Sequence, residues 1–352
     1  MKRFFACLLA LLLSLSLAGH VLALDNSVTE EKEEPKPAIV GSRVSLTEDM
    51  LTHFYMRMPE GGELPYLYVG GVRYGATETE EPGLYCATYP HFTLATMTEE
   101  VTVVPACRMD GKMLKGDTYY FSVRDYAMRL LAAEPEPALR RVLVSLLNFG
   151  AATQTYHEMR PYNLPNTYLP ASDRMTSARD YTSAFSMTGE ATQSTATLSG
   201  ATLTVVGCAS IKVYIEVAGQ EQLRLNGGAG IAGMEKLTPN AEAEKLVADI
   251  RLEVADNPAF ENAASFRLSK LKKEDGYAAS TIGIFADRYS DIYYMRLRTA
   301  EGVSRVLIYS VESYAARALA GDMRNEEQEP LLHAMMAYGD AVRAYRDQKT
   351  AP

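Results

Sequence analysis

The chain contains two pairs of similar segments, and this internal similarity constrains its fold more than any other feature. Residues 121–131 resemble residues 309–319, and both segments contain the pattern Ser-Val-x-x-Tyr-Ala. Residues 147–156 resemble residues 336–345 at nearly the same separation along the chain. Two matches in the same order are difficult to obtain by chance, so the sequence predicts two diverged copies of one folding unit.

The matched segments have the spacing of amphipathic helices, with apolar residues at i, i+3, i+4, i+7 and i+8. The two stripes are Val123, Tyr126, Ala127, Leu130 and Leu131, and Val311, Tyr314, Ala315, Ala318 and Leu319. A second helix is predicted to begin near Pro137 and near Pro330. Gly150 and Gly339 hold matched places in these second helices. Because glycine inside a helix costs about 1 kcal/mol relative to alanine, we expect another segment to pack closely against each glycine.

Strand patterns precede the helices in both copies. Residues 53–58 and 212–217 alternate between apolar and polar side chains in the same phase. Residues 66–71 are matched to residues 223–228, each a strand that runs into a glycine turn. Later strands are predicted at residues 101–104, 119–121, 292–295 and 306–309. These patterns predict an α+β fold of two similar domains, each a small antiparallel β-sandwich-like sheet closed by a C-terminal helical hairpin.

The first residues have the composition of a signal peptide. Lys2 and Arg3 precede an apolar run, and a small residue, Ala23, ends the segment before polar residues begin. An uncleaved anchor is the alternative, for which the apolar run is short. No later run approaches the roughly 20 apolar residues of a spanning helix, so we expect a secreted or cell-surface protein without a membrane span after cleavage. The predicted boundaries are a signal peptide at 1–23, a flexible acidic leader at 24–39, repeat domain 1 at 40–158, a linker at 159–194 and repeat domain 2 at 195–348.

The acidic balance of the chain restricts its partners. The formal net charge is −9 at pH 7. Binding of nucleic acid or of anionic membranes without sequence specificity needs a positive patch. We therefore expect no nucleic-acid partner.

The number of cysteines argues against a disulfide framework. Cys7 lies in the predicted signal peptide, which leaves Cys86, Cys107 and Cys208. An odd number is unlike the paired cysteines of a disulfide scaffold. A single bridge between Cys86 and Cys107 remains open for an exported protein.

The order of these patterns resembles that of an uncharacterised tandem module, strand-rich with a helical hairpin, found in secreted or cell-surface proteins of anaerobic Gram-positive bacteria. The segments that carry the resemblance are residues 45–55, 121–127 and 147–154. It covers most of residues 40–156 and, more weakly, the second copy. The resemblance implies a non-catalytic part of an extracellular or cell-wall protein, and it supplies no catalytic residues.

Two motifs that are typical of enzymes have simpler interpretations. Residues 228–233 match the G-x-G-x-x-G pattern, but no helix is predicted after them to hold a pyrophosphate, and the repeat aligns them with the Gly70-Gly71 turn. Ser269 and Lys272 match S-x-x-K, but the Ser-Asp-Asn and Lys-Thr-Gly elements of penicillin-interacting enzymes are missing. We therefore expect no cofactor and no serine nucleophile.

A metal site is not expected either. The histidines of the mature chain are His53, His91, His157 and His333, and none has the spacing of a zinc motif. Asp287 and Asp291 could hold calcium near a turn, but the spaced ligands and the glycine of an EF-hand loop are missing.

Tyrosine is the compositional feature that favours a binding function. The chain has 22 tyrosines and no tryptophan, and planar rings with a hydroxyl suit contact with sugars or proteins. The candidate ligand contacts are Tyr66, Tyr68 and Tyr74, around the first predicted hairpin.

The leading hypothesis is a non-catalytic extracellular or envelope-associated module that binds a cell-wall or dietary glycan, binds a surface protein, or acts as a spacer. The alternative is a secreted hydrolase with paired carboxylates in an inter-domain groove. Residues 229–265 form an apparent insertion in the second copy, where a specific site could lie.

Overall fold

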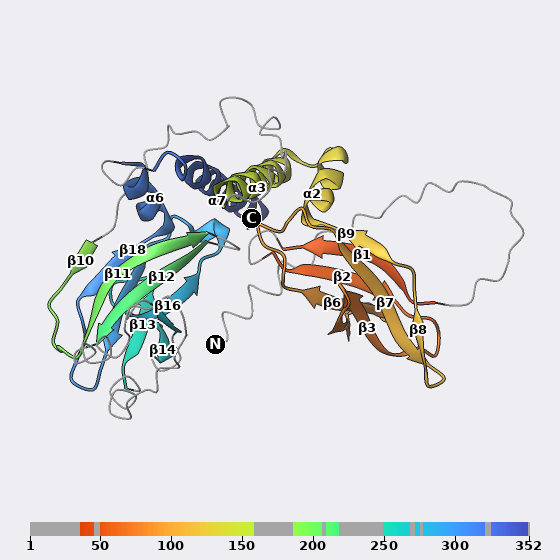
Figure 1. Ribbon diagram of the computed structural model, residues 1–352, viewed down its shortest axis with the longest axis horizontal. Coiled ribbons are helices and arrows are strands. Elements are labelled where there is room, and N and C mark those ends of the chain that lie inside the picture. Colours follow the sequence, from red (N-terminus) through yellow and green to blue (C-terminus); the bar gives the residue numbers. More distant parts are fainter. Residues whose placement is uncertain are drawn as a thin grey trace, which may run out of the picture. The chain divides into compact units, whose positions relative to one another are not determined.

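The fold is α+β, with antiparallel sheets and four helices in the part of the chain that is described (Figure 1). The computed structural model describes residues 36–45, 50–157, 186–205, 209–217, 249–267, 272–274, 277–320 and 325–350. We call residues 36–157 the N-terminal part and residues 186–350 the C-terminal part. No helix within the described ranges is both long enough and apolar enough to cross a membrane.

The N-terminal part contains two antiparallel sheets followed by two helices. Sheet A has the order β1 (Ala38–Val44), β2 (Thr52–Arg57), β6 (Leu84–Tyr89) and β5 (Thr77–Glu78). Sheet B has the order β4 (Val72–Gly75), β3 (Glu63–Val69), β7 (Val101–Met109) and β8 (Lys112–Lys115), and β9 (Tyr119–Phe121) also pairs with β7. The helices that follow are α2 (Val123–Ala132) and α3 (Pro137–Tyr156).

The C-terminal part repeats this succession of sheets and helices. Sheet D has the order β11 (Ala196–Val205), β12 (Ala209–Val217), β16 (Tyr277–Gly283) and β15 (Lys272–Glu274). Sheet C has the order β10 (Ser186–Thr188), β18 (Val306–Tyr309), β17 (Tyr293–Arg298), β13 (Arg251–Ala255) and β14 (Ala264–Arg267). A 3₁₀ turn, η3 (Ala286–Arg288), precedes β17, and α6 (Val311–Leu319) and α7 (Glu329–Thr350) end the described chain.

The first strand pair of each part has the same irregularity. The register of β1 against β2 shifts just before Gly41, which then lies opposite Tyr55. The register of β11 against β12 shifts just before Gly200, which lies opposite Tyr214. A β-bulge of this kind increases the local twist of a strand, so both sheets begin with the same local distortion.

Alternation along the strands places the large apolar side chains in the core. On β2, Phe54 and Met56 are fully buried while the side chains between them are partly exposed. The Phe54 ring meets the Phe121 ring of β9 edge to face, with 5.1 Å between centroids. This contact joins a strand of sheet A to a strand of sheet B, and edge-to-face pairs of this kind add to the stabilisation from burial.

The short helices begin at matched serine caps. The Ser122 side chain accepts a hydrogen bond from the backbone N–H of Asp125, and Ser310 accepts one from the backbone N–H of Ser313. Capping in this way satisfies a donor that the first helical turn would otherwise leave unpaired. The Ser-Val patterns from which the sequence predicted the two helices are therefore helix starts.

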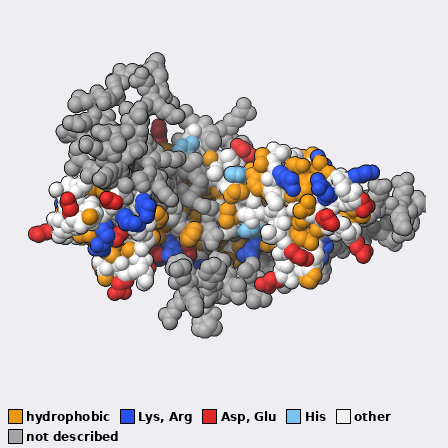
Figure 2. All heavy atoms as spheres, turned by 90° about the horizontal axis from the view of Figure 1, so that it is seen from below, with side chains coloured by type: hydrophobic (Ala, Val, Ile, Leu, Met, Phe, Trp, Pro, Cys, Tyr) orange, Lys and Arg blue, Asp and Glu red, His pale blue; other side chains and the backbone are white. Residues whose placement is uncertain are grey.

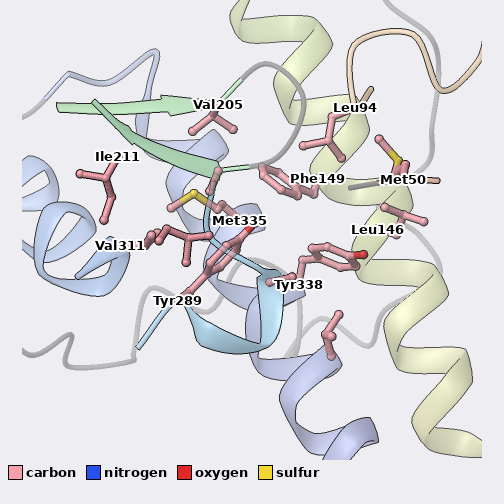
Figure 3. Close-up of a cluster of buried hydrophobic side chains, with 14 of the residues drawn as sticks. Met50, Leu94, Leu146, Phe149, Val205, Ile211, Tyr289, Val311, Met335 and Tyr338 are labelled. Atoms are coloured by element: carbon pink, nitrogen blue, oxygen red, sulfur yellow. The ribbon is translucent and has the colours of Figure 1, made fainter. Parts of the chain in front are cut away.

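The long helices α3 and α7 make the most extensive helix–helix contact of the described chain. Residues 142–150 of α3 are buried on every face. Figure 3 shows Leu146, Phe149, Met335 and Tyr338 in one cluster of buried side chains, and the rings of Phe149 and Tyr338 lie 5.8 Å apart. The middle of α3 is therefore buried on all sides, and this includes the polar side chains of Ser145 and Asn148.

The close approach expected at the helix glycines is confirmed. A Cβ at Gly150 would overlap the thioether of Met97. A Cβ at Gly339 would lie 2.6 Å from the Tyr289 ring and 2.9 Å from the backbone oxygen of Ala286. Each glycine therefore lets the segment before the helices pack directly against the helix backbone.

The first strand, β1, begins at Ala38, inside the expected leader 24–39. The strand that pairs with β17, as β3 pairs with β7, is β13 at Arg251–Ala255. The strand expected at residues 223–228 lies outside the described ranges. Both β13 and β14 begin within residues 229–265, so that segment is not wholly an insertion.

Residues 1–23 and most of the expected linker also lie outside the described ranges, although β10, within the linker, pairs with β18.

Replacing Gly339 with alanine should lower the free energy of unfolding by about 1 to 2 kcal/mol, because overpacking outweighs the gain of about 1 kcal/mol in helix propensity. Gly150→Ala should cost less, since the neighbouring group is a flexible methionine side chain. Urea unfolding checks this order. Gly75→Ala is the control, because nothing lies within 4 Å of its added Cβ. Equal or increased stability of Gly339→Ala would contradict the packing argument.

Candidate functional site

The three candidate tyrosines lie on two different faces of sheet B. Tyr66 and Tyr68 alternate with buried Leu67 on β3, and their rings meet edge to face at 5.4 Å. Tyr74 pairs with Leu67 across the hairpin and therefore points to the opposite face. There the Tyr74 ring packs against Tyr89, with 5.4 Å between centroids. Tyr66 and Tyr68 form one candidate site, and Tyr74 belongs to the packing beneath it.

Cationic side chains from neighbouring strands cover the two rings. The Arg73 guanidinium lies 4.0 Å from the centroid of the Tyr66 ring, and the Lys115 Nζ lies 5.0 Å from that of Tyr68. The face of an aromatic ring attracts a cation electrostatically. The Tyr68 hydroxyl also donates to the Met113 sulfur at 3.7 Å. These contacts hold both rings in defined positions.

We call this group of residues the tyrosine–cation surface. It comprises Tyr66, Tyr68, Arg73, Arg108, Met113 and Lys115. The pairing of β3 with β4 and β7, and of β7 with β8, places all six on the same face of sheet B. Basic side chains beside hydrophobic ones are also visible on the molecular face drawn in Figure 2.

The two tyrosines differ in exposure. Tyr66 is only 7% exposed, whereas Tyr68 is half-buried. Burial, assisted by the neighbouring Tyr68, raises the pKa of Tyr66, and the charges of Arg73 and Arg108 only partly oppose this. Tyr66 therefore stays a neutral support, and Tyr68 is the ring of the pair that a ligand could contact.

Sheet C carries an ion pair where sheet B carries Tyr68. In sheet B, Val101 of β7 pairs with β9, the strand that leads into α2. In sheet C, Tyr293 of β17 pairs with β18, the strand that leads into α6. Three residues after Val101, β7 pairs with Tyr68 of β3. Three residues after Tyr293, β17 pairs with Glu253 of β13. Glu253 therefore holds in sheet C the place that Tyr68 holds in sheet B.

The Glu253 carboxylate binds two arginines of β17. It accepts hydrogen bonds from the Nε of Arg296 at 2.8 Å and from the Nε of Arg298 at 2.5 Å. The Arg296 guanidinium also stacks on the Phe260 ring at 3.8 Å. Burial alone would raise the pKa of Glu253, but the two arginine hydrogen bonds and charges outweigh it, so the pKa is lowered. This group is a structural network in which one carboxylate holds two arginines.

Cys86 and Cys107, the cysteines within the described ranges, are free thiols. Cys86 lies on β6 of sheet A and Cys107 on β7 of sheet B, and no bridge joins them. The Cys86 sulfur lies 3.9 Å from His53 Nδ1, which is also 3.0 Å from the Thr88 hydroxyl. Burial raises the pKa of both thiols. A nucleophilic cysteine needs a lowered pKa, so Cys86 and His53 do not have the properties of an activated pair.

The acidic residues considered for calcium are bound to arginines of α7. Arg346 lies 2.6 Å from the Asp287 carboxylate, and Arg343 lies 2.6 Å from the Asp291 carboxylate. The Nε of Arg343 also donates to the backbone oxygen of Asp287 at 2.9 Å. These bonds fasten η3 to α7 and explain the two carboxylates without a metal. Across the described ranges, no group of three or more acidic, histidine or cysteine side chains is placed to hold a metal ion.

Comparison with models of protein families gives no match, and comparison with curated protein sequences gives none either. The glycine-rich segment 228–233 and Ser269 lie outside the described residues. The tyrosine–cation surface is therefore the candidate that the geometry supports.

The basic residues of this surface were missed by the interpretation of the sequence. The Gly70-Gly71 turn of two residues implies that Tyr68 lies opposite Arg73 and Leu67 opposite Tyr74, as observed. Counting residue pairs back from this turn would have separated Tyr74 from the candidate site and added Arg73 to it. Lys115 and Arg108 had no comparable signal, because the pairing of β3 with β7 contains a register shift.

Glu253→Gln should lower the free energy of unfolding at pH 7 by about 1.5 to 3 kcal/mol, since two arginines lose their charged acceptor. The pKa of Glu253 is lower in the folded than in the unfolded chain, so its stabilisation is present above the ordinary glutamate pKa and is lost as the pH falls through the lowered value. The difference from the native chain should therefore shrink on acidification. Urea unfolding at stepwise lower pH checks this. The exposed Glu216, changed to Gln, is the control, and a pH-independent difference for Glu253→Gln would contradict the pairing argument.

Proposed function

We propose that this protein is a non-catalytic extracellular or cell-envelope-associated module that binds a glycan through the tyrosine–cation surface. The observation that carries the proposal is the Tyr66–Tyr68 ring pair, held by Arg73 and Lys115. Export through the signal peptide predicted at 1–23 would bring this surface to cell-wall or dietary glycans. A protein partner or a spacer role is the competing outcome of the experiment below.

The arrangement of Tyr68 suits contact with a sugar. Its ring is half-buried, with Tyr66 at its edge, Lys115 near its face and Met113 at its hydroxyl. A tyrosine presents a flat apolar ring together with a polar group. A side chain that is already fixed loses little conformational entropy when a ligand binds. These properties favour stacking of a sugar ring beside Tyr68, with hydrogen bonds at its edge.

The proposed architecture is a tandem duplication of a sandwich-like sheet unit closed by two helices. Four matched features support it: the strand succession, the bulges before Gly41 and Gly200, the serine caps and the helix glycines. If the units diverged after duplication, the tyrosine–cation surface belongs to the first unit and the Glu253 network to the second. Binding is therefore assigned to the N-terminal part.

Tyr68→Ala should weaken binding of the exported chain (residues 24–352) to its best glycan on an array by about tenfold, which corresponds to about 1.4 kcal/mol. Tyr214→Ala is the matched control, because Tyr214 is also a half-buried strand tyrosine beside a lysine, Lys212 at 5.5 Å. Titration calorimetry with that glycan measures both variants. Equal loss in the two variants, or unchanged binding in Tyr68→Ala, would contradict the assigned surface. Absence of glycan binding by the native chain would leave the protein-binding or spacer role.

A further inference from the structure

The tyrosine–cation surface presents positive charge that the surrounding chain leaves available. Arg73, Arg108 and Lys115 are exposed and come from three different strands, β4, β7 and β8. In the described part of the chain, none of these three cations forms an ion pair. Glu63 lies opposite Arg108 in the register but makes no such contact. The surface is thus locally basic on a chain whose net charge is −9.

In sheet C, the strand position that Tyr68 holds in sheet B is occupied by a carboxylate, that of Glu253. There Glu253 lies between two arginines and binds both of them. In sheet B the residue at this place is Tyr68, which carries no charge. The two arginines that Glu253 binds lie on β17 at the places that Val104 and Ala106 hold on β7, so the cations around Tyr68 come from other positions, and no ion pair with a carboxylate is formed by them in the described ranges.

We propose that the ligand of the tyrosine–cation surface is an acidic glycan, whose uronate-type carboxylates bind Arg73, Arg108 and Lys115 while a sugar ring lies against Tyr68. This inference rests on the proposed function and adds the chemical class of the ligand. A guanidinium group matches a carboxylate in geometry and can bind both of its oxygens. The carboxylate of Glu253 between two arginines in sheet C favours a carboxylate over a phosphate as the bound anion.

The decisive comparison uses polygalacturonate and its fully methyl-esterified form, because the two polymers share a backbone and differ in charge. The exported chain should bind the acid form at least tenfold more tightly than the ester. Its affinity should fall as sodium chloride is raised, because salt screens exposed charges. Calorimetry or affinity electrophoresis in gels that contain each polymer gives the readout.

Two variants locate the charge on the tyrosine–cation surface. The double variant Arg73→Gln, Lys115→Gln should lose at least tenfold in affinity for polygalacturonate. Tyr68→Glu places a carboxylate where sheet C has Glu253, and it should lose more affinity than Tyr68→Phe. Lys212→Gln is the control, since Lys212 also lies over a strand tyrosine, but on β12. Unchanged urea midpoints establish that each variant is folded.

The outcomes separate this inference from the function on which it rests. Equal affinity for the acid and the ester, or tighter binding of poly(glycerol phosphate) than of polygalacturonate, would overturn the carboxylate assignment while leaving a glycan-binding module. Full affinity of the double variant would overturn the assignment of the charges to this surface. If no glycan binds the native chain at all, the proposed function fails together with the inference.

Discussion

The contact between α3 and α7 is the interaction on which the rest of the structure depends. Each helix is almost entirely buried in its middle turns, so each supplies core to the strands beside it and to the other helix. Phe149 and Tyr338 meet at the centre of this contact, and Lys349 pairs with Glu136 at 2.9 Å. Burial of large aromatic and aliphatic side chains is the dominant favourable term in folding. The two sets of sheets are therefore held through their last helices.

In each part, the segment that precedes the helices is hydrogen-bonded to the long helix. The bond is in the matched place in the two parts, but the side chain that makes it differs. In the N-terminal part, the Gln154 amide of α3 donates to the backbone oxygen of Ala95 at 3.1 Å. In the C-terminal part, Arg343 of α7 donates to the backbone oxygen of Asp287 at 2.9 Å. Arg343 also binds the Asp291 carboxylate, and Arg346 binds that of Asp287. Both aspartates are thus part of the framework, and the buried Asp287 in particular requires a partner for its carboxylate.

One strand position carries different side chains in the two parts: Tyr68 in sheet B and Glu253 in sheet C. With Glu253, the face is closed by internal ion pairs. With Tyr68, the neighbouring cations lie over aromatic rings and stay accessible. The two faces differ at several matched positions: Glu253 and Arg296 in sheet C stand where sheet B has Tyr68 and Val104. Function is carried by the residues placed on the fold rather than by the fold itself.

The sequence by itself determined the elements whose physics is local. Apolar spacing identified the helices, the serines before Val123 and Val311 began the short ones, and the helix glycines indicated close packing. Tertiary structure decided which faces meet. The pairing of β13 with β17 was not predicted from the sequence, because strand partners are chosen by long-range pairing. The candidate site was half-predicted for the same reason: alternation along β3 joins Tyr66 to Tyr68, but only the pairing of β4, β7 and β8 brings the three cations to them.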